Sequence, residues 1–358
     1  MPRHLTRAER LLRTMLVVAG VVVALVVWVV SSSSASSPSA TSSTSETVPP
    51  TSAVPTTTLP KSPLGVGLMQ VTVTEPTRKL CIPMTTTCVV RNYQLQIYYP
   101  AITSGPTPMP SASPAKFEAP FPVLLFAHGF DLVPADYLPL ISKWVSAGFL
   151  VAAPIFPLSS SDSLQEHGVQ LSDVAEADAY EGDILNQPGD LSAAINELTT
   201  LNTAGAGSLS NLINLSEIAA AGQSDGGDTV LAATANTCCI DPRIKVALIL
   251  SGAAFPAFPG IFYSAPPIPT LVVQGSADTV NPPAASQQIY SSLKGIKYYL
   301  NLIGADHLQP YTSVDPYEEQ VVKISIAFLE EYLLGRTVGQ SEILALGNLP
   351  GVSQVTAG

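Results

Sequence analysis

The sequence predicts an α/β fold in which helices cover both faces of a mostly parallel central sheet. Beyond about residue 65, apolar runs typical of strands alternate with runs typical of helices, which is the pattern of such folds. The later apolar runs are almost continuous, as expected for strands that are covered on both faces. These runs are PVLLFAHG, FLVAAP, EIAAAGQS, IKVALILSG, PTLVVQGS and KYYLNLIG.

Two strands are expected before this series, MQVTVTE and NYQLQIYYP. The second alternates apolar and polar residues, which is typical of a half-buried antiparallel strand. A helix is predicted between the first two buried strands, because apolar residues recur at helical spacing before Gly148. We interpret this stripe as ordinary core; its members are Tyr137, Leu138, Ile141, Trp144 and Val145.

The last predicted helix begins in DPYEEQ and ends near Gly335. Asp315 can cap it, Pro316 suits its first position and Glu318 completes a capping-box pattern. No repeat and no second domain is visible. We therefore assign one α/β domain to residues 65–338 and a C-terminal extension to 339–358.

Composition limits the classes of function. The chain has 358 residues, of which 46% are hydrophobic, enough to fill a sizeable core. Its formal net charge of -11 makes nucleic acid an unlikely partner.

The N-terminal segment, residues 1–30, has the composition of an export signal or membrane anchor. Four arginines precede an uninterrupted apolar run at 15–30. At about 1.5 Å per residue, this run reaches roughly 24 Å, less than the roughly 30 Å of a hydrocarbon core. Signal peptide and anchor both remain open; the poor cleavage site in SSSSASS favours the anchor. In either case the remainder is expected outside the cytoplasm.

Residues 31–64 are rich in Ser, Thr and Pro, a composition typical of a disordered linker. All four cysteines follow this linker, where oxidation is permitted. We expect a short disulfide between Cys81 and Cys88. The adjacent Cys238 and Cys239 could bond to each other, bond elsewhere or stay thiols. Neither the cysteine spacing nor the histidines are those of a zinc site.

The stretch EIAAAGQSDGGDTVL places one serine among glycines between a strand-like and a helix-like run. A serine hydroxyl is a weak nucleophile that must stand clear of its surroundings beside a base. A sharp strand-to-helix turn provides this exposure and crowds the backbone around the serine. Gly222 and Gly226 flank Ser224 in the resulting G-x-S-x-G pattern. Ser224 is therefore the candidate nucleophile.

The base and acid follow in the order expected for such a site. LVVQGSADTV ends one buried strand with Asp278, and YLNLIGADHLQP ends the next with His307. His167 is the rival base, but its polar, loop-like setting suggests a surface histidine. Asp306 is the second choice of acid, because neighbouring residues rarely present their side chains to each other.

An oxyanion hole is expected where LLFAHGFD follows the first buried strand. Gly129 lets the backbone turn, so one donor would be the Phe130 N–H. The other would be the N–H of Asp225, the residue after the nucleophile. We expect the Asp225 side chain to turn away, because a carboxylate near a developing oxyanion is unfavourable.

These residues resemble the α/β-hydrolase family over about residues 65–336. Within it the chain is most similar to the chlorophyllase, platelet-activating-factor acetylhydrolase and cutinase-like polyester-hydrolase group. HGF, NQPGDLSAAINEL and GADHLQPY carry this similarity. The resemblance implies hydrolysis of a carboxylic ester, such as an acyl lipid or a polyester, without a cofactor. The sequence departs from the group at Gln223, where histidine is common, and at Asp225, where an apolar residue is frequent.

The short segment 251–268 leaves no room for a large lid, and we expect its aromatic residues, Phe255, Phe258, Phe262 and Tyr263, at the rim of an apolar cleft. The acidic segment 172–183 is interpreted as a solvated face, not a metal site.

Two other classes of function remain open from the sequence. An envelope acyltransferase would use the same three residues, with an alcohol attacking the acyl-enzyme in place of water. A tethered, non-catalytic binding module is disfavoured by the full set of candidate residues.

Overall fold

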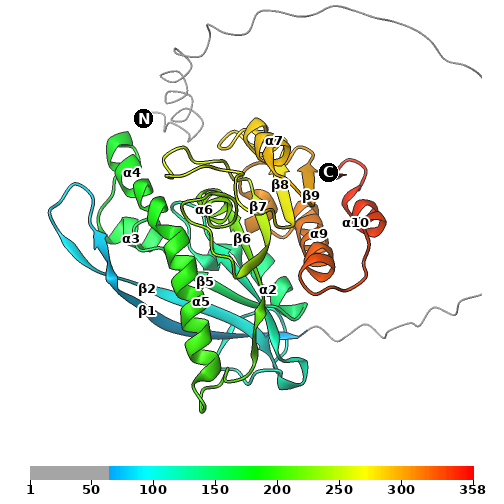
Figure 1. Ribbon diagram of the computed structural model, residues 1–358, viewed down its shortest axis with the longest axis horizontal. Helices are drawn as coiled ribbons and strands as arrows, with labels where there is room; N and C mark the ends of the chain where they lie inside the picture. Colours follow the sequence, from blue (N-terminus) through cyan, green and yellow to red (C-terminus); the bar gives the residue numbers. More distant parts are fainter. Residues whose placement is uncertain (1–63) are drawn as a thin grey trace, which may run out of the picture. The chain divides into compact units, whose positions relative to one another are not determined.

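The computed structural model describes residues 64–358. Their strands form one ten-stranded sheet in the order β10-β9-β8-β7-β6-β4-β5-β2-β1-β3 (Figure 1). The strands are β1 (Gly65–Cys81), β2 (Cys88–Ala101), β3 (Met109–Pro110), β4 (Phe121–Ala127), β5 (Leu150–Pro154), β6 (Ile213–Gln223), β7 (Ile244–Leu250), β8 (Thr270–Gly275), β9 (Lys297–Leu302) and β10 (Ser353–Ala357).

The centre of the sheet is parallel. β5, β4, β6, β7, β8 and β9 pair in parallel, whereas β2 pairs antiparallel with β5 and β1 antiparallel with β2. The near-continuous apolar runs of the sequence are these six parallel strands. The predicted α/β class is therefore confirmed.

Helices cover both faces of the sheet. On β4, Leu124 and Phe126 pack with α2 and α9, whereas Val123 and Leu125 face the core shared with α5 and α6. Alternate residues of one strand thus enter two different cores, as the period of a strand requires. The helices are α2 (Leu138–Ser146), α3 (Ser161–Glu166), α4 (Val174–Glu181), α5 (Gln187–Thr203), α6 (Asp225–Ala235), α7 (Pro283–Ser292), α8 (Gln309–Thr312), α9 (Pro316–Tyr332) and α10 (Gln340–Gly347).

The two helices predicted by pattern are present. Trp144 of α2 is fully buried, and its Nε1 donates a hydrogen bond to Ser325 Oγ at 2.8 Å. At the start of α9 the Asp315 carboxylate accepts from the backbone N–H of Tyr317 and of Glu318. The Glu318 side chain does not complete the expected capping box, because its Oε2 lies 2.6 Å from Lys143 Nζ. The ion pair of Glu318 with Lys143 therefore replaces the predicted capping interaction.

Residues 339–358 were expected to extend beyond the domain. They form α10 and β10, and β10 pairs antiparallel with β9 at the edge of the sheet. Val355 of β10 is buried and packs in the same core as α9. The run SQVTA is too short to be recognised as a strand from its pattern alone.

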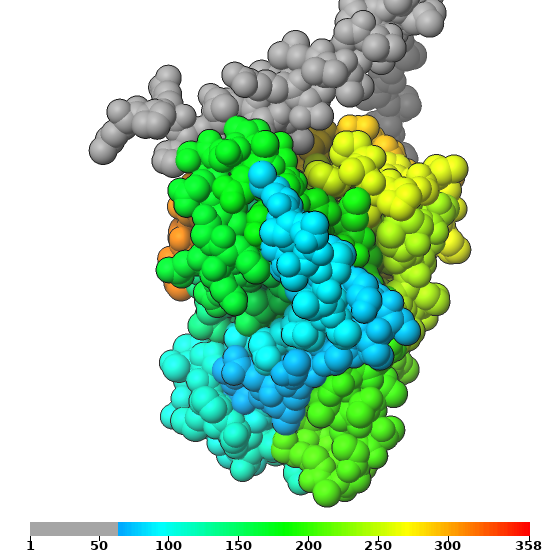
Figure 2. All heavy atoms as spheres, turned by 90° about the vertical axis from the view of Figure 1, so that its left-hand side faces the viewer, coloured from blue at the N-terminus to red at the C-terminus, as the bar shows by residue number. Residues whose placement is uncertain are grey.

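β1 and β2 form a long hairpin whose tip lies against α3 and α4. In Figure 2 it is the blue band that runs over the surface beside green segments. Leu80 and Ile82 near its tip pack with Leu158, Leu164 and Tyr180. The predicted disulfide between Cys81 and Cys88 closes the tip, where the two residues are directly paired.

A buried ion cluster fixes the same hairpin to α5. The Arg91 guanidinium of β2 is fully buried and donates to the carboxylates of Asp183 and Asp190. Arg78 of β1 donates to Asp190 at 2.8 Å and also to Glu75. Burial raises the pKa of Asp183 and Asp190, although their bonds to Arg91 oppose this shift. The sequence predicts that Asp183 belongs to a solvated acidic face. This prediction is wrong for Asp183, because its side chain is buried and paired with Arg91.

Removing the Cys81–Cys88 disulfide should destabilise the protein by about 2 to 3 kcal/mol, because the bond restricts a short loop of the unfolded chain. The measurement is the free energy of unfolding in urea for wild type and Cys81→Ser/Cys88→Ser. Cys238→Ser/Cys239→Ser is the control, since those adjacent cysteines also form a disulfide but close almost no loop. Equal losses in the two double variants would contradict the prediction.

The predicted N-terminal signal or anchor at 1–30 and the linker up to residue 63 lie outside the described residues. Within residues 64–358, no helix combines the length and the apolar character needed to cross a membrane.

Candidate active site

Ser224 lies in a sharp turn between β6 and α6. Its backbone has φ 56° and ψ -122°, a left-handed conformation that is costly for a residue with a Cβ. A Cβ on Gly222 would collide with the Gly226 carbonyl, and one on Gly226 with the Ala127 carbonyl. Both glycines of the G-x-S-x-G pattern are thus required by close backbone approach.

His307 and Asp278 reach Ser224 from the loops after β9 and β8. His307 Nε2 lies 2.9 Å from Ser224 Oγ, and His307 Nδ1 lies 2.7 Å from Asp278 Oδ2. Parallel strands end at the same edge of a sheet, which explains why residues far apart in sequence meet here. The structure thus brings together the three residues that the sequence selected.

The Asp278 carboxylate is held in place by several donors. Its Oδ1 accepts from the backbone N–H of Val280 and Asn281, and its Oδ2 accepts from Gln274 Nε2. Burial raises the pKa of Asp278, but the hydrogen bonds from His307 and from these backbone groups outweigh it and lower the pKa. Asp278 is therefore ionised at neutral pH and places a carboxylate beside the imidazole.

The two rival residues are placed elsewhere. Asp306 Oδ1 accepts from the backbone N–H of Leu308 and Gln309, in the turn that leads into α8. His167 is exposed at the end of α3, where its ring lies 5.8 Å from the ring of Tyr180. Neither side chain has a hydrogen bond to His307 or Ser224 among the contacts of residues 64–358.

The turn after β4 adjoins Ser224. A Cβ on Gly129 would lie 2.8 Å from Gln223 Oε1 and 3.2 Å from Ser224 Cβ, so glycine suits this close approach. The Gly129 carbonyl accepts a hydrogen bond from His128 Nδ1 at 2.8 Å, and His128 Nε2 accepts from Phe156 N–H. In a trans peptide the carbonyl and the next N–H point in opposite directions. The Phe130 N–H therefore points away from His128, and Phe130 is one of the residues that line the pocket.

Burial of His128 lowers its pKa to about 4, because the charged ring is poorly solvated there. This pKa is below the ordinary value of about 6.5, so the neutral ring stabilises the fold fully above pH 6.5. The contribution, at most about 3.4 kcal/mol, is lost as the pH falls from 6.5 toward 4.

Replacing His128 should therefore remove part of the acid sensitivity of the fold. We expect the loss of unfolding free energy between pH 7 and pH 4.5 to be about 2 kcal/mol smaller in His128→Asn than in wild type. Urea unfolding at the two pH values measures this difference. The exposed His167 supplies the control, since His167→Asn should keep the wild-type pH dependence. Parallel stability curves for wild type and His128→Asn would refute the assignment.

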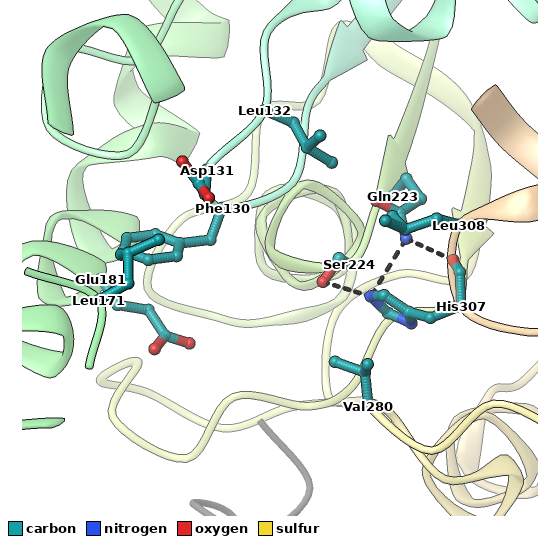
Figure 3. A pocket seen from close by; sticks show the side chains of 10 residues that line it. All are labelled: Phe130, Asp131, Leu132, Leu171, Glu181, Gln223, Ser224, Val280, His307 and Leu308. Atoms are coloured by element: carbon teal, nitrogen blue, oxygen red, sulfur yellow. Dashed lines mark hydrogen bonds between the residues drawn. The ribbon is translucent and has the colours of Figure 1, made fainter. Parts of the chain in front are cut away.

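A pocket of about 280 Å³ opens in front of Ser224 and His307. Figure 3 shows Phe130, Leu171 and Glu181 grouped on the side away from His307. Five of the side chains that line the pocket are apolar, and two carry carboxylates. The apolar residues are Phe130, Leu132, Leu171, Val280 and Leu308; the carboxylates are Asp131 and Glu181.

The aromatic residues expected at the cleft rim are not among the residues that line this pocket. Phe258 is buried, and Phe255 and Phe262 pack with it, Ile184 and Ala232 in a separate cluster. Tyr263 lies at a different depression of the surface, beside Thr234 and Pro267. These aromatic side chains pack against one another, so the expectation that they form the rim of the cleft is not met.

The remaining polar side chains lie outside the pocket. Asp225 begins α6 with a fully buried side chain and is not among the residues that line the pocket. In the acidic segment, Asp173 caps α4 by accepting from Ala175 and Glu176. The described part of the chain holds no group of three or more His, Cys, Asp or Glu residues arranged for a metal ion. Cys238 and Cys239 form a disulfide with each other, the first of the alternatives left open.

The comparison with family models agrees with this geometry. Residues 183–340, which include Ser224, Asp278 and His307, match the model of the PETase family, described as PET hydrolase-like. The matched segment, residues 183–340, is PET hydrolase-like. It is accordingly an α/β-hydrolase and a carboxylic-ester hydrolase of the serine type, and the predicted resemblance to cutinase-like polyester hydrolases is confirmed. No match was found among curated proteins.

Two polar residues next to the candidate site carry no signal in the sequence that marks them as part of it. The helical spacing of Tyr137 indicates ordinary core, and Gln223 stands out in the sequence only as a departure from the related enzymes. Both are fully buried, and their side chains are hydrogen-bonded to each other at 2.7 Å. No sequence motif marks such a pair, because the two residues lie on separate elements.

Proposed function

We propose that the PET hydrolase-like domain cleaves esters through Ser224, His307 and Asp278 and forms an acyl-enzyme on Ser224. The two short contacts of His307, to Ser224 Oγ at 2.9 Å and to Asp278 Oδ2 at 2.7 Å, carry this proposal. His307 can remove the serine proton when its Nδ1 carries a hydrogen and its Nε2 has a lone pair.

The reaction has two steps. In the first, His307 Nε2 takes the Ser224 proton while Oγ attacks the ester carbonyl, and the imidazolium then protonates the departing alcohol. The N–H groups of Phe130 and Asp225 stabilise the negative carbonyl oxygen of the tetrahedral intermediate. In the second step, water loses a proton to His307, attacks the acyl-enzyme and releases the acid.

The pocket supports a substrate that is only partly enclosed. A volume of about 280 Å³ is at the lower limit of sites that enclose a drug-sized ligand. A short acyl group, or one unit of a polyester, fits beside Phe130 and Leu132, whereas the rest of a longer ester must extend outside. An acyl lipid and a polyester surface both meet this condition.

A panel of soluble esters of graded acyl length, with an insoluble polyester, tests the proposal. We expect kcat/KM to be highest for short acyl groups and acid to be released from the polyester. Parallel reactions with glycerol or a sugar separate hydrolysis from transfer, because a transferase would form a new ester and release less acid. Absence of acid release from every ester would refute the proposed function.

Action outside the cytoplasm is supported by two disulfides in the described part of the chain, Cys81–Cys88 and Cys238–Cys239. Such bonds persist mainly in oxidising compartments. Whether residues 1–30 are cleaved or retained can be measured by N-terminal sequencing of the exported protein.

A further inference from the structure

Gln223 immediately precedes the candidate nucleophile, and its side chain is fully buried. Its Oε1 lies 2.7 Å from Tyr137 Oη, and its Nε2 lies 3.0 Å from the backbone carbonyl oxygen of His307. The same Nε2 is 3.2 Å from His307 Nε2, the atom that faces Ser224 (Figure 3). One amide thus contacts both the backbone and the reactive nitrogen of the candidate base.

The direction of these hydrogen bonds is fixed by backbone groups at both ends. The Gly129 N–H can only donate, and it lies 3.0 Å from Tyr137 Oη. Tyr137 therefore accepts from Gly129 and donates its own proton to Gln223 Oε1. At the other end the His307 carbonyl can only accept, so the NH₂ group of Gln223 must face it.

The result is a continuous, buried chain of hydrogen bonds from the turn that carries Phe130 to the loop that carries His307. Its links run from Gly129 to Tyr137, then to Gln223, then to His307. Buried chains of this kind restrict the groups that they connect, because an unsatisfied member would be costly. The oxyanion turn and the base are thereby held in a fixed relation on either side of Ser224.

The amide also has a chemical property that matters once His307 is protonated. Its NH₂ group lies at the same neutral Nε2 that accepts from Ser224 Oγ, and it offers no acceptor to a protonated Nε2. We propose that Gln223 is a positioning residue, which holds the imidazole toward Ser224. Because Gln223 does not accept the proton of the imidazolium, this proton goes to the departing alcohol of the substrate. This inference rests on the proposed function, and it assigns a role to the residue by which the chain departs from related enzymes.

Gln223→Glu is the most informative change, because it keeps the shape and replaces the donor by an acceptor. A carboxylate beside Nε2 should bind the imidazolium and retain its proton. We expect kcat to fall at least about tenfold with KM changed less than about twofold, and the acid limb of kcat/KM to move to higher pH. The other charged groups around the pocket are the same in both proteins: Asp278 at Nδ1, the adjacent Asp306, Asp225 at the start of α6, and Asp131 and Glu181 across the pocket.

Tyr137→Phe interrupts the chain by removing one oxygen, so it serves if changes at Gln223 prevent folding. It should lower kcat about fivefold, the effect expected for one hydrogen bond of ordinary strength. Gln223→Met removes the amide and should lower kcat at least about fivefold. Adding Tyr137→Phe to it should cause no further loss of kcat, because both changes break the same chain of hydrogen bonds.

Gln187→Met is the matched control for Gln223→Met. Gln187 is also a fully buried glutamine with two side-chain hydrogen bonds, to Ser159 and Thr229, and it is not among the residues that line the pocket. It should lose stability but keep the wild-type kcat. Melting temperatures measured on all variants separate loss of fold from loss of positioning.

The inference is overturned if wild type hydrolyses the ester and Gln223→Glu keeps its kcat within twofold and its acid limb unmoved. Additive losses of kcat in the double variant would also overturn it. An inactive wild type instead refutes the proposed function and this inference with it, so the two failures are distinguishable.

Discussion

Ser224→Ala should lower kcat at least about a thousandfold on any ester that the protein hydrolyses. The change removes one oxygen atom, whereas His307, Asp278 and the N–H groups of the turn remain. The residual rate would come from substrate binding and oxyanion stabilisation alone. The measurements are kcat on a soluble ester and the mass of the protein after treatment with a fluorophosphonate, which should add one adduct to wild type, on Ser224.

Ser353→Ala is a suitable control for this experiment. Ser353 is also a buried serine, its Oγ donates to the Gly347 carbonyl at 2.8 Å, and it lies on β10, away from the pocket. This variant should keep the wild-type kcat and its adduct. Stoichiometric labelling that persists in Ser224→Ala would show that another residue is the nucleophile.

Asp278→Asn should reduce kcat by roughly three to four orders of magnitude. An asparagine amide at this position can donate to His307 Nδ1, which would put the imidazole proton on Nε2 and leave no lone pair for the Ser224 proton. The fold should persist, because the amide oxygen can still accept from the Val280 and Asn281 N–H groups that now bind Asp278. The measurement is kcat/KM against pH, which should rise from acid toward neutrality in wild type.

Asp306→Asn distinguishes the two candidate acids. Asp306 accepts two backbone hydrogen bonds at the start of α8, and an asparagine oxygen can accept the same bonds. This variant should therefore retain activity close to that of wild type. A large loss in Asp306→Asn together with normal activity in Asp278→Asn would reverse the assignment.

Local regularities in the sequence determined the strands, the helices and the turn around Ser224. Strands covered on both faces require apolar runs, and the close approach of Gly222 and Gly226 to neighbouring carbonyls admits only glycine. The chain order of Ser224, Asp278 and His307 also follows from strands that end at one edge of a parallel sheet. These features are encoded within short segments, so a single sequence is sufficient to predict them.

Only the tertiary structure decided which side chains meet across segments. It placed Asp278 rather than Asp306 at His307, and it packed Phe258 in a core of its own instead of at the pocket. It also joined Tyr137 to Gln223, two residues that no sequence motif relates. The physical reason is that a hydrogen bond depends on atoms within about 3 Å, and such proximity between residues far apart in sequence arises only when the sheet and its loops are assembled.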